Sequence, residues 1–229
     1  VGERALLVAA AHRHGDEAHP HRREQRSEPV DRVAEEQADA VSRLESRPAK
    51  SGPRYESLSA FASVKGGAAD GSFDEIWIVD DASALAWKLG ADDWIKSVEG
   101  SDAWIGGAPL AMSDFSPLPR GAYRIVAIDP AGRRAERSFT LAGEFPARPA
   151  PTISLDKAGA AVASSWPETL VVAYDGAGEL AGTAAAPSSR SSLASLFGPA
   201  VAPRAVEVAA YGYDPAVRMG AYSERAEVK

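Results

Sequence analysis

All four histidines of the chain, at positions 12, 14, 19 and 21, fall within one ten-residue stretch. His12 and His14 form one His-x-His pair, His19 and His21 form a second, and two carboxylates lie between the pairs. Imidazole and carboxylate groups are the ligands that Zn, Ni and Cu prefer. In an extended chain alternate residues share a face, so each pair could hold one divalent ion. The alternative is a solvated polar segment that merely contains histidines, because His-rich composition alone is only suggestive.

Beyond residue 21 the chain has neither histidine nor cysteine. Imidazole is the commonest general base in enzymes, and thiols and His-activated hydroxyls are the commonest nucleophiles. Ser164, Ser165 and the serines at 188–192 therefore have no base available. We expect no catalytic residues and predict that the protein is not an enzyme.

Four of the five tryptophans lie between residues 77 and 104, interleaved with aspartates. Aromatic faces beside carboxylates can hold sugars, and a carboxylate pair can hydrolyse a glycosidic bond. A small core that takes its bulk from these rings explains the same residues, since alanine fills little volume. We assign Trp77 and Trp104 to the core. Trp87 and Trp94 remain open, and they define an alternative function as a carbohydrate- or peptidoglycan-binding module.

The composition limits the class of protein. A length of 229 residues predicts about two compact units. The net charge of −7 argues against nucleic-acid binding, which needs a basic face. No apolar run approaches the roughly 20 residues that span a bilayer. The sequence starts at Val1, with a short apolar stretch at 5–11, and a removed upstream export signal is consistent with an extracytoplasmic location, in the periplasm or cell envelope.

Residues 1–66 are charged, and their pattern predicts a helical N-terminal arm. Small apolar residues recur at helical spacing between Val30 and Leu44, and charged residues cover the other faces. A second, short helix is predicted over 54–65. The apolar stripe of the first helix is thin, so it would gain most from packing on a partner. We expect an interaction surface at Val30, Val33, Val41 and Leu44.

From residue 73 the pattern changes to strands and turns. The segment 73–79 is β-rich, and 121–141 predicts a hairpin. Three strands end in similar turns that start at Asp129, Asp175 and Asp214, where the aspartate is expected to bond its own turn backbone. A proline-rich linker at 145–151 separates two predicted units, 67–145 and 146–229. Residues 181–192 read as an exposed loop.

The residues before the predicted hairpin resemble a known motif. Leu118, Gly121 and Tyr123, followed by a strand and a turn, are similar to the tyrosine corner of fibronectin type III and immunoglobulin-like sandwiches, as found in bacterial cell-envelope proteins. Residues 220–228 resemble the last strand of such a unit. The resemblance implies that the Tyr123 hydroxyl bonds to the backbone upstream. By analogy with the family, it also implies roles in display and adhesion.

Together these patterns predict a mainly β protein with one or two small immunoglobulin-like or fibronectin type III-like β-sandwich units, preceded by an α-helical N-terminal arm. We expect a non-catalytic structural or interaction protein of the cell envelope. Its partners would be other protein subunits or a second copy, with no nucleic acid and no transmembrane segment. No cofactor is expected apart from the divalent metal that the histidine cluster could bind.

Overall fold

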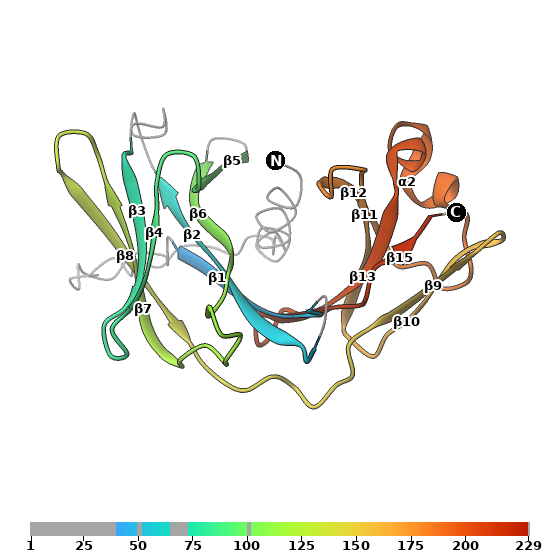
Figure 1. Ribbon diagram of the computed structural model, residues 1–229, viewed down its shortest axis with the longest axis horizontal. Helices are drawn as coiled ribbons and strands as arrows, with labels where there is room; N and C mark the ends of the chain where they lie inside the picture. Colours follow the sequence, from blue (N-terminus) through green and yellow to red (C-terminus); the bar gives the residue numbers. More distant parts are fainter. Residues whose placement is uncertain (1–39, 50–51, 65–72, 100–101, 229) are drawn as a thin grey trace, which may run out of the picture.

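The computed structural model of the protein describes residues 40–49, 52–64, 73–99 and 102–228. In these residues three sheets and one short helix form two lobes, which Figure 1 shows side by side. The mainly β class is confirmed. Within the described parts of the chain, no helix has the length and apolar character needed to cross a membrane.

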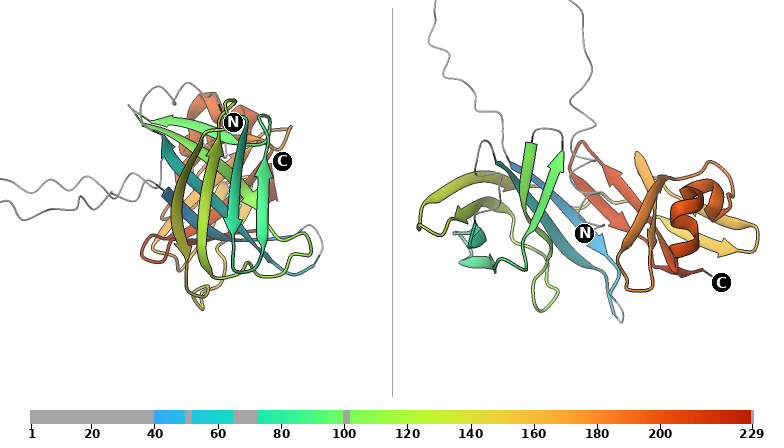
Figure 2. Two further views of the ribbon diagram at one scale, coloured as in Figure 1. Left: turned by 90° about the vertical axis from the view of Figure 1, so that its left-hand side faces the viewer. Right: turned by 90° about the horizontal axis from the view of Figure 1, so that it is seen from above.

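One large sheet runs through both lobes. Its strand order is β12 (Leu180–Ala185), β11 (Glu168–Tyr174), β13 (Glu207–Asp214), β14 (Met219–Tyr222), β1 (Ala40–Arg47), β2 (Tyr55–Val64), β6 (Asp102–Leu110) and β5 (Ile95–Glu99), and β15 (Ala226–Glu227) pairs with β13. The lobes join where β1 pairs in parallel with β14, with Leu44 opposite Met219. The sheet curves between the lobes, as seen from above in Figure 2.

In the first lobe a four-stranded sheet packs against one face of β1, β2 and β6. Its order is β4 (Leu85–Leu89), β3 (Glu75–Asp80), β7 (Gly121–Ile128) and β8 (Arg134–Leu141). Alternation places Ile76 and Ile78 of β3 inward, as expected for a half-buried strand. The apolar side chains of both sheets form the main core, which includes Leu44, Leu58, Ala60, Ile105, Tyr123, Ile125, Phe139 and Leu141.

In the second lobe a hairpin and a helix cover one face of β11 and β13. The hairpin pairs β9 (Thr152–Asp156) with β10 (Gly159–Ala163), and the helix is α2 (Leu193–Val201), followed by the 3-10 turn η2 (Ala202–Arg204). The Ser192 hydroxyl accepts a hydrogen bond from the Ser195 N–H and caps α2. Val171, Ala173 and Val208 fill this second core. The opposite face of β11 and β13 is therefore left for other contacts.

The structure corrects the predicted helices wherever it describes them. Val41 and Leu44 lie on β1, and residues 55–64 form β2, so the first strand pair is central to the large sheet and not a helical arm. On a strand Val41 and Leu44 point to opposite faces: Leu44 enters the main core, and Val41 packs near Phe61 and Trp104. Pairing along all eight residues of β1 with β2 overrides the weak helical spacing. Val30, Val33 and the rest of the predicted arm up to residue 39 lie outside the described residues.

Several predicted turns and strands are confirmed. The hairpin at 121–141 is β7 and β8, and the β-rich run at 73–79 overlaps β3, which begins at Glu75 and ends at Asp80. The Asp129 side chain accepts N–H bonds from Ala131 and Arg133, and Asp175 accepts the equivalent pair from its own turn. Asp214 accepts one such bond, from the Ala216 N–H. The loop predicted at 181–192 is wrong in its first half, where β12 forms.

The Tyr123 hydroxyl donates a 2.8 Å hydrogen bond to the carbonyl of Pro119, four residues upstream. Tyr123 is fully buried and stacks on Phe139, with 5.4 Å between the ring centroids. This bond anchors the connection between β6 and β7. The arrangement of the sheets does not identify a fibronectin type III or immunoglobulin-like module.

Candidate functional site

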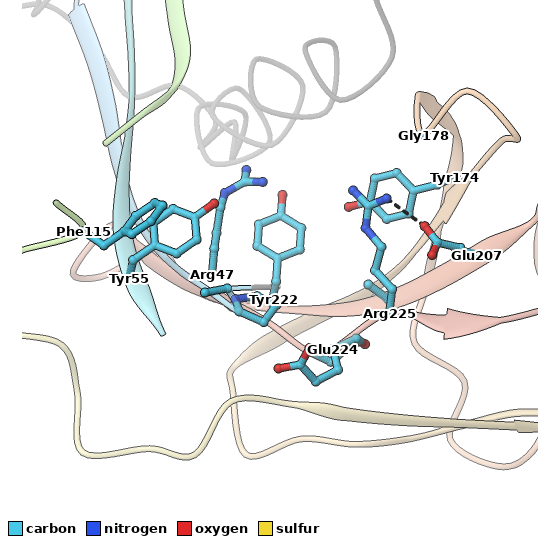
Figure 3. Close-up of a pocket in the computed structure, with 13 residues that line it drawn as sticks. Arg47, Tyr55, Phe115, Tyr174, Gly178, Glu207, Tyr222, Glu224 and Arg225 are labelled. Carbon is cyan, nitrogen blue, oxygen red and sulfur yellow. Dashed lines mark hydrogen bonds and ion pairs between the residues drawn. The ribbon is translucent and has the colours of Figure 1, made fainter. Parts of the chain in front are cut away.

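A groove of about 850 Å³ lies between the two lobes, over the face of the large sheet that points away from the main core. Figure 3 shows its side chains converging from both lobes. Strand β1 contributes Arg47 and β14 contributes Tyr222 at the centre of the groove. Its other lining residues are Pro48, Ala49, Tyr55, Phe115, Tyr174, Gly178, Glu207, Ala209, Ser223, Glu224 and Arg225.

Strand alternation explains why polar and aromatic side chains share this face. In β1 the residues on the groove face are Arg43, Glu45 and Arg47, while Leu44 points into the main core. In β13 and β14 the same face carries tyrosines at 211, 213 and 222, and Tyr174 of β11 belongs to the same buried cluster. The parallel pairing of β1 with β14 places the charged row directly beside the tyrosine row.

Each arginine on this face lies over a tyrosine ring. The guanidinium carbon is 4.2 Å from the Tyr213 ring centroid for Arg43 and 4.4 Å from the Tyr222 centroid for Arg47. Arg225 lies over Tyr174 in the same way, at 3.7 Å. Guanidinium planes over aromatic faces gain a cation–π attraction that is larger when the pair is desolvated. The stacking orients the arginines before any ligand arrives.

A glycine makes room for the central tyrosine. The rings of Tyr211 and Tyr222 lie 4.5 Å apart between centroids, and the Tyr211 ring passes directly over Gly220 of β14. A Cβ atom at Gly220 would lie 2.4 Å from the Tyr211 hydroxyl oxygen. The tyrosine therefore reaches β1, where its hydroxyl accepts a 3.4 Å hydrogen bond from Arg43.

Two ion pairs lie on this face. Glu45 is 0% exposed, and its Oε2 accepts a 2.8 Å bond from Arg47, whose Nε donates to Ser57 at 2.9 Å. Arg225 pairs with Glu207 at 2.8 Å. Buried polar atoms on this face without a hydrogen-bond partner among the described residues include Oε1 of Glu45, the hydroxyl of Tyr222 and the hydroxyl of Ser59, which is opposite Arg43 in β2. Of these three residues only Tyr222 lines the groove, and because buried polar atoms are normally satisfied, its hydroxyl is the one that can bond a ligand there.

Three ionisable groups below the groove, Arg43, Tyr211 and Tyr222, keep their charge states across the ordinary pH range. Burial raises the pKa of Tyr211 and Tyr222 well above the usual value, and the nearby Glu45 charge raises it further. Burial acts to lower the pKa of Arg43, but attraction to Tyr211, Glu45 and Tyr213 outweighs it and raises the pKa overall. Tyr211 and Tyr222 stay neutral and Arg43 stays charged, so these groups can donate and accept hydrogen bonds without exchanging protons.

One wall of the groove carries an exposed aromatic ring. Phe115, in the connection between β6 and β7, is 58% exposed and lies 4.9 Å from Tyr55 between ring centroids. Its φ of 60° is in the left-handed region, which is costly for a residue other than glycine. Its N–H donates to the Met112 carbonyl, and the Asp114 carboxylate accepts from the Ser116 N–H, which holds the turn. The turn presents the phenyl ring to solvent at the edge of the groove.

The predicted sugar-binding tryptophans lie elsewhere. Trp87 and Trp94 are partly buried, pack against the main core of the first lobe, and do not line the groove. Trp87 donates from Nε1 to the Ala111 carbonyl at 3.4 Å. The core assignment of Trp104 is confirmed, since it packs with Phe61 and Ile95.

The core assignment of Trp77 is wrong. Its side chain is on the outer face of β3, where alternation puts it opposite Ile76 and Ile78. There its Nε1 donates to Glu75, and the Lys88 ammonium lies 5.3 Å from the ring centroid.

The four histidines lie outside the described residues. Within the residues that are described, no group of three or more histidine, cysteine, aspartate or glutamate side chains could hold a metal ion. The groove residues were missed at the sequence level because the helix prediction hid the alternation Arg43, Glu45, Arg47. That alternation, and the tyrosine pair at 211 and 213, are the signals of a polar strand face.

Comparisons with protein-family models, with curated proteins and with solved structures find no match to this chain. The candidate site therefore rests on the geometry of the groove and on the chemistry of its side chains.

Proposed function

We propose that this protein is a non-catalytic binding protein and that the groove between the lobes is its binding site. The observation that carries the proposal is the stacking of Arg47 and Arg225 on tyrosine rings at two positions along one continuous sheet. Side chains fixed by stacking and ion pairs lose little conformational freedom when a ligand binds, which favours affinity. The groove volume lies within the roughly 300–1,000 Å³ typical of small-ligand sites.

The chemistry of the groove supports binding over turnover. Its arginines are ion-paired with glutamates, and the Tyr222 hydroxyl has a raised pKa. A general base needs a pKa near the working pH, and a nucleophile needs a base beside it. The lining offers hydrogen bonds and aromatic faces, which orient a bound molecule.

A thermal-shift screen of the full chain tests this proposal. The panel contains neutral glycans, anionic glycans, short peptides and nucleotides, and a true ligand raises the melting temperature by mass action. Phe115→Ala removes an exposed aromatic ring of the groove, and Val217→Ala is the matched control because Val217 is an exposed apolar residue outside the lining. We expect a ligand whose stabilisation falls in Phe115→Ala and persists in Val217→Ala. If no class stabilises the protein, or if both variants respond alike, the groove is not the binding site.

Assembly with other subunits or with a second copy, outside the cytoplasm in the cell envelope, is the remaining part of the proposal. Analytical ultracentrifugation of the full chain and immunoblotting of fractionated native cells check it. We expect sedimentation as a complex when the chain is isolated from envelope extracts. Recovery as a monomer from the cytoplasmic fraction would contradict this part and leave the groove unaffected.

A further inference from the structure

We propose that the groove binds a neutral saccharide, with the Tyr222 hydroxyl as the central group that hydrogen-bonds a hydroxyl of the sugar. This inference rests on the proposed binding function and names the class of ligand. It is carried by the Tyr222 hydroxyl, a buried polar group of the groove lining that lacks a hydrogen-bond partner among the residues described.

Tyr222 lies on the same sheet face as the ion pair of Glu45 with Arg47. Glu45 of β1 is opposite Gly220 of β14, and Tyr222 is two residues further along β14 on the same side. Arg47 connects them, since it bonds Glu45 and stacks on Tyr222. In Figure 3 the Tyr222 ring stands between Arg47 and Arg225 with its hydroxyl end toward the groove.

The hydrogen-bonding requirement of this hydroxyl selects the ligand. A tyrosine hydroxyl can donate or accept a hydrogen bond. A sugar hydroxyl also does both, so it can satisfy the Tyr222 hydroxyl in either direction. An apolar ligand would leave the Tyr222 hydroxyl unsatisfied, at the cost that attaches to buried polar groups.

The charge of the lining favours a neutral molecule. The lining contains two arginines, Arg47 and Arg225, and two glutamates, Glu207 and Glu224. Arg47 and Arg225 already bond the carboxylates of Glu45 and Glu207. An anionic ligand would displace these ion pairs and face the glutamates, and a cationic ligand would face the arginines. A neutral ligand leaves every pair in place.

The aromatic pair of Phe115 and Tyr55 provides the apolar part of the site from the first lobe. The rings of Tyr174 and Tyr222 lie beneath Arg225 and Arg47 and are buried, so Phe115 is the exposed ring of the groove. A pyranose ring has C–H faces and a polar edge, which matches an aromatic wall beside a hydrogen-bonding hydroxyl. The volume of about 850 Å³ accommodates more than one sugar ring.

An array of neutral and anionic glycans, followed by calorimetric titration of the full chain with the best binder, tests the inference. Tyr222→Phe removes one hydroxyl and keeps the ring. Tyr213→Phe is the matched control: it makes the same change on the same sheet face at a residue outside the lining. We expect a neutral oligosaccharide to bind, Tyr222→Phe to weaken it about fivefold, and Tyr213→Phe to change it less than about twofold.

A ligand-side measurement covers the case in which Tyr222→Phe does not fold. Deoxy analogues of the bound sugar, titrated into the unaltered protein, should include at least one that loses about fivefold in affinity. A neutral glycan insensitive to every deoxy change and to Tyr222→Phe would overturn the inference. Groove binding by an anionic glycan or a peptide alone would overturn it and leave the binding function standing. If no class of ligand binds, both the saccharide inference and the proposed binding function are contradicted.

Discussion

The substitution Gly220→Ala tests the packing that forms the floor of the groove. Gly220 is in β14, and the Tyr211 ring lies over its backbone. An added Cβ would be 2.4 Å from the Tyr211 hydroxyl oxygen and 2.6 Å from Cε2 of the same ring. Real Cβ atoms do not approach other heavy atoms so closely, so the ring or the strand must move. The ring has little room, because it packs against Tyr222 and Tyr213 and its hydroxyl accepts a bond from Arg43.

Two opposing contributions set the expected magnitude. Overpacking a buried site costs about 1–3 kcal/mol. Alanine gains about 0.5–1 kcal/mol over glycine in a strand because the unfolded chain loses less freedom. The difference is a net loss of about 0–2.5 kcal/mol with a central value of about 1.3 kcal/mol, and for a chain of this length the central value lowers the melting temperature by about 3–5 °C.

Urea unfolding followed by circular dichroism measures this loss. The control is Gly176→Ala, where a Cβ would meet only Val206 Cγ2 at an ordinary 3.8 Å, and where we expect a change within about 0.5 kcal/mol. If Gly220→Ala is as stable as the unaltered protein while Gly176→Ala is also neutral, the Tyr211 ring does not lie over β14, and the described floor of the groove is incorrect.

Two further predictions concern the buried tyrosines. Tyr123→Phe removes the 2.8 Å bond to the Pro119 carbonyl and should lower the free energy of unfolding by about 1–2 kcal/mol in urea; a loss below about 0.3 kcal/mol would show that the bond is not stabilising. Stability should also fall as pH rises from about 10 to 12. Burial raises the pKa of Tyr123 to about 12 and also raises the pKa of Tyr211 and Tyr222. As the pH rises, the unfolded chain therefore releases phenolic protons that the folded chain retains. The free energy of unfolding falls by about 1.4 kcal/mol per pH unit for each fully buried tyrosine. Urea unfolding at pH 8 and pH 11, with phenolate absorbance as a second signal, measures this, and equal stability at the two pH values would contradict it.

The sequence was informative where structure is local. The turns at Asp129 and Asp175 follow from a side chain that bonds the N–H groups two and four residues ahead, which needs no distant partner. The hairpin of β7 and β8 has alternating residues on both sides of a short turn. Tyr123 was predicted to bond upstream backbone from a motif of a few residues, and the structure places that bond at Pro119.

The large sheet was not predictable in this way because its central pairing is remote in sequence. Strand β1 pairs with β14, some 175 residues away, at Leu44 and Met219. Helical spacing of small apolar residues around Val41 is a weak signal, and pairing on both edges of β1 outweighs it. The groove was missed for the same reason: Arg47, Tyr222 and Arg225 come together only after the two halves of the chain share one sheet.

A crystal structure of the full chain with its tightest neutral oligosaccharide tests the central claim most directly. We expect a sugar ring between Arg47 and Arg225, with one hydroxyl about 3 Å or less from the Tyr222 hydroxyl. A saccharide bound instead at Trp87 and Trp94, with the groove between the lobes left free of it, would contradict the account.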